Sequence, residues 1–401
     1  MDTDELVYGR PFFQVLGGSL LTMVGLSMHY HFGEFVAYRG LDEAQLGWIT
    51  GLGVAGSIAL RPYAGRWIDR LGCRNTFLLS ACVAAAANGG FLFAESLAAI
   101  IMLRIILVAA TSTYLAAVAV YAALSAPPLR RAESLGTIGI GGFAGMTIGP
   151  AIGDAIFSGA TNNDETFFRF FAIIAISNVL AGALVAHLPT PRHLRPPDRR
   201  GFVELLRNHW PGTILLVGVV FGAALTIHMS FLERFAHTRG FEDIRWFFFV
   251  YAPTAIFLRI FLRRIPQQVG RRRVCILGML ATAGGILLFI AVHETWQLIF
   301  PALLMGCGHA FVFPSMVDLA AEAMPENQRG LGTSVALGAS DMGMLIGGIT
   351  WGQMIDGVGY VPTFVTCAVA ITVVTAIYAG RRMMRISSDR RRSLELSTSG
   401  R

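Results

Sequence analysis

The stretch Pro189-Thr-Pro-Arg-His-Leu-Arg-Pro-Pro-Asp-Arg-Arg-Gly201 is the only long polar, proline-rich segment of this 401-residue chain. On both sides of it, apolar segments of about 20 residues recur, each long enough for a helix to cross a bilayer. Six segments precede the stretch and six follow it. We therefore predict an all-α membrane protein with twelve transmembrane helices, near residues 12–37, 45–65, 77–95, 97–125, 136–158, 167–188, 211–233, 245–263, 274–293, 296–323, 331–356 and 361–380.

The overall composition agrees with membrane embedding. The chain is 54% hydrophobic and only 14% charged, whereas a soluble domain carries about 25% charged residues. Its 45 glycines suit membrane helices that pack closely. This composition excludes a soluble multidomain enzyme, and we expect the lipid bilayer to surround the chain.

The basic residues are all arginines, and they concentrate on one side of the predicted membrane. The linker and the C-terminal tail are rich in arginine, while the loops of the opposite side hold acids such as Asp42, Glu95 and Glu294. This asymmetry follows the positive-inside rule. It predicts a cytoplasmic (inner) membrane protein with both termini in the cytoplasm. The net charge of +7 is then a topology signal, and we expect no nucleic-acid partner.

The two halves of the chain resemble each other. Arg61 and Arg259 hold equivalent places, and two strings recur: Phe35-Val-Ala-Tyr-Arg-Gly40 as Phe235-Ala-His-Thr-Arg-Gly240, and Leu135-Gly-Thr137 as Leu331-Gly-Thr333. A parallel six-plus-six repeat is typical of transporters whose halves rock around a midplane site. We expect four parts: an N-terminal six-helix bundle (1–188), a cytoplasmic linker (189–210), a C-terminal six-helix bundle (211–380) and a disordered cytoplasmic tail (381–401).

The connection after the second predicted helix is Gly65-Arg-Trp-Ile-Asp69-Arg70-Leu-Gly72-Cys-Arg74. It resembles the signature loop of the major facilitator superfamily, except that Cys73 stands where a basic residue is usual. Glycine permits a tight turn, and a carboxylate that pairs with an arginine or a helix N-terminus can hold one conformation. The alternative is a positive-inside loop without a gating role. The resemblance implies gating by Gly65, Asp69, Arg70, Gly72 and Arg74.

A second motif lies in the fifth predicted helix, with glycines at 136, 145, 149 and 153 and a proline at 150. This spacing resembles the motif of proton-coupled exporters in the same superfamily, although Asp154 stands where a further glycine is common. Small residues let helices pack closely, and a proline bends a helix. The resemblance implies that Gly149 and Pro150 act as a hinge. Small-residue packing alone is the alternative.

Ionisable side chains inside predicted membrane helices are costly and are therefore functional candidates. By residue counting, His31, Glu34, Arg104 and Asp154 fall in the outer half of the membrane, where one ionic cluster could couple proton flow to rocking. Alternatively, Glu34 is an interfacial residue and Asp154 an exposed helix end. In the second half, His309 and Asp341 lie closest to the midplane, and we predict a role in substrate or proton binding.

Motifs for other kinds of chemistry are missing from the sequence. There is no lysine-containing phosphate loop, no hydrolytic nucleophile motif and no zinc-binding motif. The five cysteines, at 73, 82, 275, 307 and 367, lack metal-ligand spacing. We expect neither enzyme activity nor a cofactor nor a metal.

The resemblance implies a secondary transporter that moves a small solute by alternating access. We expect a monomer that couples efflux of an amphipathic or drug-like compound to protons. The alternative is proton-coupled uptake or exchange of an organic anion such as a monocarboxylate. Gly47-Trp48 and Arg259 are similar to features of monocarboxylate carriers in the same superfamily. If Arg259 reaches the cavity rather than the membrane surface, the anion interpretation gains weight.

Overall fold

The computed structural model describes residues 9–125, 131–159, 162–189, 206–241, 243–262, 265–325 and 328–398. Within these ranges the chain is almost entirely helical and contains no strand. Most of the predicted linker, residues 190–205, lies outside the described part of the chain. The all-α fold class is confirmed.

The first half contains two notable interruptions. A 3₁₀ turn breaks the first span just before Glu34, and Gly72, with φ 77° and ψ 156°, divides the longest helix into two spans. Only glycine adopts such a positive φ without strain, so the glycine of the signature loop ends one membrane crossing and begins the next. The elements are α1 (Arg10–Met28), η1 (His29–His31), α2 (Phe32–Tyr38), α3 (Glu43–Gly90), η2 (Phe91–Phe93), α4 (Leu97–Ser125), α5 (Arg131–Phe157) and α6 (Asp164–Val185).

The second half repeats this plan. Its first span is interrupted by a π-helical turn at the place where the first half has its 3₁₀ turn, and Gly270 repeats the positive φ of Gly72. The elements are α8 (Ile214–Thr226), η4 (Ile227–Phe231), α9 (Leu232–Thr238), α10 (Arg245–Phe261), η5 (Pro266–Gly270), α11 (Arg271–Leu288), η6 (Phe289–Ala291), η7 (Thr295–Leu298), α12 (Ile299–Glu322), α13 (Arg329–Val358) and α14 (Tyr360–Thr398).

Within the described ranges, nine segments are long and apolar enough to cross a membrane by themselves. The other three predicted spans are the first part of α3, α10 and α13. These helices face protein on the side where the halves meet: α3 packs on α13, and α10 packs on α5. The first part of α3 and α13 are rich in glycine, which suits close packing and weakens their apolar signal, whereas α10 has no glycine and is only 17 residues long.

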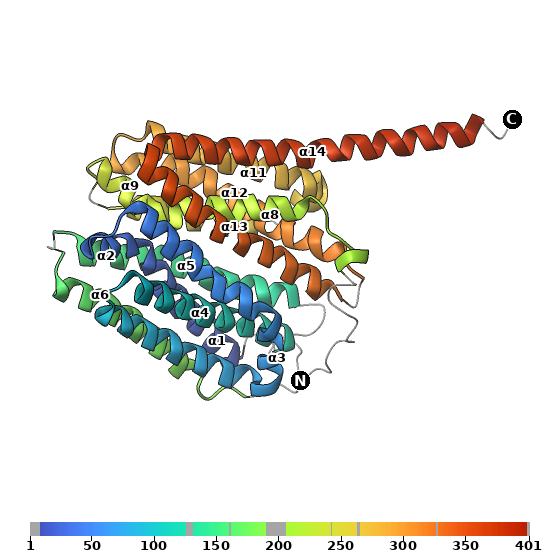
Figure 1. Ribbon diagram of the computed structural model, residues 1–401. Helices are drawn as coiled ribbons and strands as arrows, with labels where there is room; N and C mark the ends of the chain where they lie inside the picture. Colours follow the sequence, from blue (N-terminus) through green and yellow to red (C-terminus); the bar gives the residue numbers. More distant parts are fainter. Residues whose placement is uncertain are drawn as a thin grey trace.

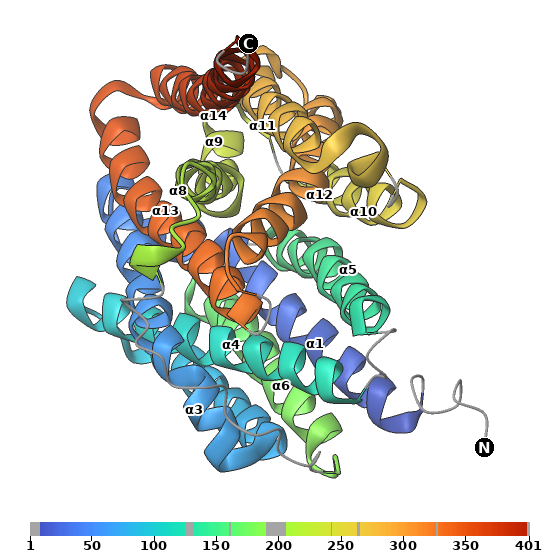
Figure 2. The ribbon, with the colours of Figure 1, turned by 90° about the vertical axis from the view of Figure 1, so that its right-hand side faces the viewer.

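The helices form two groups that lie side by side. In Figure 1 the helices of the first half fill the lower part of the molecule, and those of the second half fill the upper part. Figure 2, turned by 90°, shows α5 and α13 between the two groups. We call the end of the molecule with α2, α9 and the loops 39–42 and 239–244 the distal end. The opposite end, where α1 begins, is the proximal end.

The last helix, α14, runs to Thr398 and projects beyond the other helices in Figure 1. We predicted a disordered cytoplasmic tail at residues 381–401. The structure instead continues the helix, and the sequence offers no glycine or proline between Gly380 and Gly400 that would end it.

Candidate functional site

A cluster of acids and histidines joins the two halves at the distal end. His31, in η1, is fully enclosed, and its Nδ1 hydrogen-bonds the Oε1 of Glu233 on α9. Its Nε2 contacts the carbonyl of Pro150 at 3.1 Å and lies 3.5 Å from the Oδ1 of Asp154. Asp154 in turn accepts a hydrogen bond from the backbone N–H of Ile244, at 3.2 Å. One imidazole therefore connects three segments from both halves.

Glu34 extends this cluster, one helical turn beyond His31. Its Oε1 lies 2.7 Å from the Nε2 of His237, and its Oε2 accepts a hydrogen bond of 2.7 Å from Asn162. Together with Glu233, these side chains line a cavity of about 110 Å³. We define the distal cluster as His31, Glu34, Asp154, Glu233 and His237.

A second group of contacts closes the same end beside the distal cluster. Arg234 Nε lies 2.7 Å from the Oε1 of Glu43, and the hydroxyl of Tyr360 donates to the same oxygen at 3.1 Å. Glycines at 47 and 51 on α3 lie directly against glycines at 348 and 352 on α13, so the two backbones touch. The hydrogen bonds and ion pairs that the described residues make between the halves concentrate at this end, which is therefore closed.

The glycine motif of α5 explains how His31 is held. Gly145 and Gly149 pack on the backbone of α1, where Ser27 donates a hydrogen bond of 2.8 Å to the carbonyl of Gly145. Gly153 lies against the imidazole of His31, and a Cβ there would collide with the ring. These glycines join two helices of the same half, and the carbonyl of Pro150 points at His31. The motif thus positions the distal cluster.

Near the middle of the helices, one ion pair crosses between the halves. Arg61 on α3 pairs with the Oδ2 of Asp341 on α13, and the hydroxyl of Ser57 donates to the same oxygen at 2.8 Å. The side chain of Arg61 is 27% exposed and that of Asp341 is 16% exposed. A small cavity of about 30 Å³ adjoins Ser57 and Arg61. Arg61 therefore pairs with an acid across the contact between the halves.

Two other interior arginines have no acidic partner among the described residues. The Arg259 guanidinium lies 4.5 Å from the ring centre of Phe143, which belongs to the other half, and its Nη2 donates to the carbonyl of His309 at 3.5 Å. The Arg104 guanidinium lies 5.0 Å from the ring centre of Phe32. One nitrogen of each guanidinium is buried without a hydrogen-bond partner. Arg259 therefore reaches the contact between the halves.

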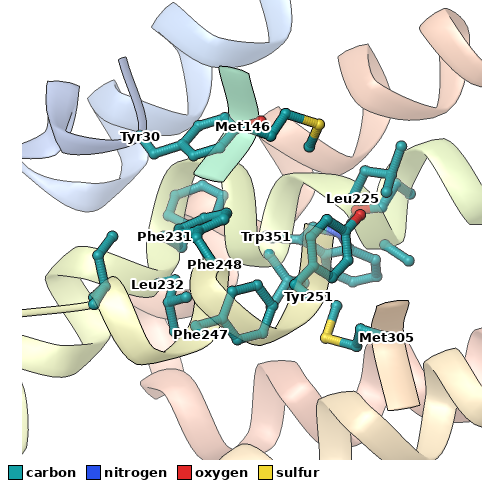
Figure 3. Close-up of a cluster of buried hydrophobic side chains, with 14 of the residues drawn as sticks. Tyr30, Met146, Leu225, Phe231, Leu232, Phe247, Phe248, Tyr251, Met305 and Trp351 are labelled. Atoms are coloured by element: carbon teal, nitrogen blue, oxygen red, sulfur yellow. Dashed lines mark hydrogen bonds between the residues drawn. The ribbon is translucent and has the colours of Figure 1, made fainter. Parts of the chain in front are cut away.

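Aromatic side chains surround this region. Tyr30 of the first half stacks on Phe248 of the second with ring centres 4.8 Å apart, and Figure 3 shows this pair beside Phe231, Tyr251 and Met146. The Tyr251 hydroxyl hydrogen-bonds the Nδ1 of His309. The interior is thus apolar and aromatic, and the guanidinium groups of Arg104 and Arg259 lie at its edge without an acidic partner among the described residues.

The structure separates the predicted site residues into groups. His31, Glu34 and Asp154 meet in the distal cluster, but Arg104 does not join them, since it lies on Phe32 instead. His309 and Asp341 have different partners and belong to separate contacts. In the predicted gating loop, Arg70 and Arg74 are exposed, while the surroundings of Gly65 and of the Asp69 side chain lie outside the described part.

Sequence reasoning missed Glu233 and His237. Both lie at the end of an apolar span, where a charged residue is normally interpreted as lying at the membrane surface. The available signal was the repeat, because Phe35 and Phe235 align and so bring Glu34 in the first half to the same level as Glu233 and His237 in the second half.

The two six-helix halves meet along α3–α13 and α5–α10, and charged side chains lie between them at the distal end. This arrangement defines a helical membrane transporter. The model of the Major Facilitator Superfamily matches residues 12–266 and 240–395. The chain therefore belongs to the major facilitator superfamily, and it is a transporter and not an enzyme.

Relatives support the same class. The Staphylopine export protein of Staphylococcus aureus is 22% identical over 381 residues, which cover 88% of this chain and 92% of that protein. An MFS-type transporter of Burkholderia pseudomallei is 26% identical over 347 residues, with 83% and 82% covered. A crystal structure of the nucleoside transporter NupG, in a mutant form, superposes with a TM-score of 0.79 at 14% identity, covering 92% of this chain and 99% of that one.

Proposed function

We propose that this transporter exports a small amphipathic organic solute that carries an anionic group, in exchange for protons. The observation that carries the proposal is Arg259, which lies half-buried at the contact between the halves without an acidic partner among the described residues. A guanidinium in a poorly hydrated interior attracts a carboxylate or phosphate, which it can bind through two parallel hydrogen bonds. An organic cation would meet repulsion at the same place.

The surroundings of Arg259 favour an amphipathic solute over a small inorganic anion. Phe143, Tyr251 and His309 offer ring faces within contact of the same region. Such a region suits a ligand with an apolar body and one polar group. Arg104, on the aromatic face of Phe32, is a second positive group available to the solute.

Export is supported by two observations. The glycine and proline motif of α5 resembles that of proton-coupled exporters, and one relative is named an export protein. The arginine-rich proximal end would face the cytoplasm by the positive-inside rule. The closed distal end then makes this the state that receives solute from the cytoplasm. In the full cycle the two six-helix bundles of one monomer would rock about their contact.

For proton coupling we propose Asp341. Asp341, on α13, faces Arg61 and Ser57, which both belong to α3. Protonation of Asp341 would remove the negative charge that holds Arg61 and so free the two halves to move apart. Among the other elements that pack on α13, α8 has no charged residue, α14 has none before Gly380, and on α12 Asp318 and Glu322 bind Arg271 while His309 bonds Tyr251. The turn η4 adds one titratable side chain, the buried His228, which packs against the rings of Phe247 and Tyr251.

The test uses inside-out proteoliposomes with an acidic lumen and a pH-sensitive dye. Organic anions with an aromatic or aliphatic body should release protons from the lumen, and organic cations should not. At a solute concentration near the KM of the unmodified protein, Arg259→Gln should lose most of the response, whereas Arg169→Gln, a change at an exposed arginine of α6, should leave it intact. A response to cations alone would overturn the substrate class. Solute accumulation driven by an inward proton gradient in the opposite orientation would show uptake instead of export.

A further inference from the structure

The distal cluster has the composition of a transition-metal site. One ligand atom from each of Glu34, Glu233 and His237 lies within 4.8 Å of the other two. Two carboxylates and an imidazole are a nitrogen and oxygen donor set that suits Zn²⁺ and neighbouring divalent metals. Glu233 and His237 are four residues apart on α9, so they share one face of a helical turn. We propose that these three side chains bind a divalent transition-metal ion and that this ion ties the two halves together at the distal end.

An unsatisfied oxygen at this place supports the assignment independently of the cluster. Glu233 is only 3% exposed, its Oε1 is engaged by His31, and its Oε2 is buried without a hydrogen-bond partner. A buried carboxylate oxygen without a partner costs free energy. Because Glu233 lines the cavity of about 110 Å³, a cation there would satisfy that oxygen. The cavity has room for an ion and several water molecules, since one water occupies about 30 Å³.

The charges around the cavity also favour a cation. Nearby arginines are already neutralised, because Arg234 pairs with Glu43 and Arg245 pairs with Asp243 at 2.9 Å. Three carboxylates remain, those of Glu34, Asp154 and Glu233, and two imidazoles face them. Arg245 Nε lies 4.0 Å from the Oδ2 of Asp154, whereas among the described residues Glu34 and Glu233 form ion pairs only with imidazoles, so a divalent ion would balance these two carboxylates.

The contacts behind the ligands have the form of an outer shell. His31 holds Glu233, and Asn162 donates to the Oε2 of Glu34, which leaves Oε1 directed at His237. Outer contacts of this kind orient metal ligands and tune affinity. The side chain of His237 is 51% exposed, so an ion can enter from solution at the distal end. The metal would replace the direct contact between His237 and Glu34.

The ion would join α2 of the first half to α9 of the second. It would therefore stabilise the state in which the distal end is closed. The expected consequence is inhibition of transport by micromolar Zn²⁺ added at the distal side. Binding itself does not depend on the identity of the solute or on proton coupling, so it can be measured without transport.

The experiment titrates Co²⁺ into the purified full-length protein and follows the visible absorption bands of bound Co²⁺, with Zn²⁺ competition and calorimetry for stoichiometry. We expect one Co²⁺ per chain, displaced by Zn²⁺. Cys82 is exposed, so ligation by a thiolate must be distinguished. Nitrogen and oxygen ligation gives no thiolate-to-metal charge-transfer band in the near ultraviolet.

Two variants test the ligands. Outer-shell changes in metal sites already weaken binding by about 10–100-fold, and His237→Asn and Glu233→Gln should each weaken Co²⁺ binding at least as much. His293→Asn, a change at an exposed histidine of the same end, should have no effect. His237→Asn alters a half-exposed side chain, so its fold, checked by size-exclusion chromatography, should be retained. Unchanged Co²⁺ binding in a folded His237→Asn protein, or no bound Co²⁺ in the unmodified protein, would overturn the proposal.

Discussion

The two halves of this transporter place an arginine at the same position and surround it differently. In the first half Arg61 meets Ser57 on its own helix and Asp341 across the contact. In the second half Arg259 meets the ring of Phe143 and the carbonyl of His309. Asp341 thus neutralises Arg61, whereas no acidic side chain among the described residues neutralises Arg259.

The internal repeat explains how this difference arises. The match of Leu135-Gly-Thr137 with Leu331-Gly-Thr333 aligns Asp341 with Gly145, and the match of the two arginines aligns Ser57 with Ala255. The positions around Arg259 that correspond to Asp341 and Ser57 are thus Gly145 and Ala255, which supply neither an acid nor a hydroxyl. From this comparison we infer a division between two sites: the pair of Arg61 and Asp341 couples transport to the proton, and Arg259 binds the anionic solute.

Removing the unpaired arginine should have the largest effect. A hydrogen bond to a charged group contributes about 1.5–3 kcal/mol, so Arg259→Gln should raise the KM for an anionic solute by about 10–100-fold. Arg259→Lys should recover part of this loss, because a lysine keeps the charge and loses the two-pronged geometry. Solute-dependent proton release measured over a concentration series gives the KM, and an unaltered KM in Arg259→Gln would contradict the division.

Supplying the missing acid should have the next largest effect. Phe143→Glu places a carboxylate beneath Arg259 and so makes the second side similar to the first. The new ion pair should compete with the solute and raise its KM by about tenfold, as expected for an interaction of about 1.4 kcal/mol. Phe143→Leu removes the ring without adding a charge, and it is the matched control. Equal effects of the two changes would show that the ring matters and the charge does not.

The smallest effect should come from the hydroxyl that distinguishes the two sides. Ser57→Ala removes one hydrogen bond to Asp341, worth about 1 kcal/mol, and should lower the rate of proton-coupled transport by about fivefold. Ala255→Ser makes the converse change on the Arg259 side, where no acid accepts the bond, and should leave the rate within twofold of its original value, a difference of about 0.4 kcal/mol. Comparable losses of transport rate in Ser57→Ala and Ala255→Ser would contradict the proposed difference between the Arg61 and Arg259 sites.

Much of the fold could be predicted from the sequence, because apolar spans, arginine-rich loops and the repeat are local patterns. The weakest apolar signals were those of the first part of α3 and of α13, which pack on each other where the two halves meet. The continuation of α14 to Thr398 was missed, since composition indicates solvation but not whether a solvated segment stays helical.

The site was harder to predict because its contacts join residues far apart in the chain. His31 and Glu233 are 202 positions apart, and Arg61 and Asp341 are 280 positions apart. Hydropathy identified His31, Asp154 and Asp341 as ionisable residues within apolar spans, but it could not show that Arg104 packs on Phe32 instead of pairing with an acid. Pairing across the halves depends on helix rotation, which sequence periodicity resolves poorly in helices that are apolar on all sides.

The most direct test of the central claim is to measure proton movement and solute exchange in the same Asp341→Asn proteoliposomes. Exchange of labelled for unlabelled solute requires solute binding and rocking, whereas net transport against a gradient also requires the proton. We predict that Asp341→Asn loses solute-dependent proton movement and keeps solute exchange, while Arg259→Gln, at a solute concentration near the original KM, weakens both. Proton movement that persists at its original stoichiometry in Asp341→Asn would contradict the claim that this carboxylate carries the coupled proton.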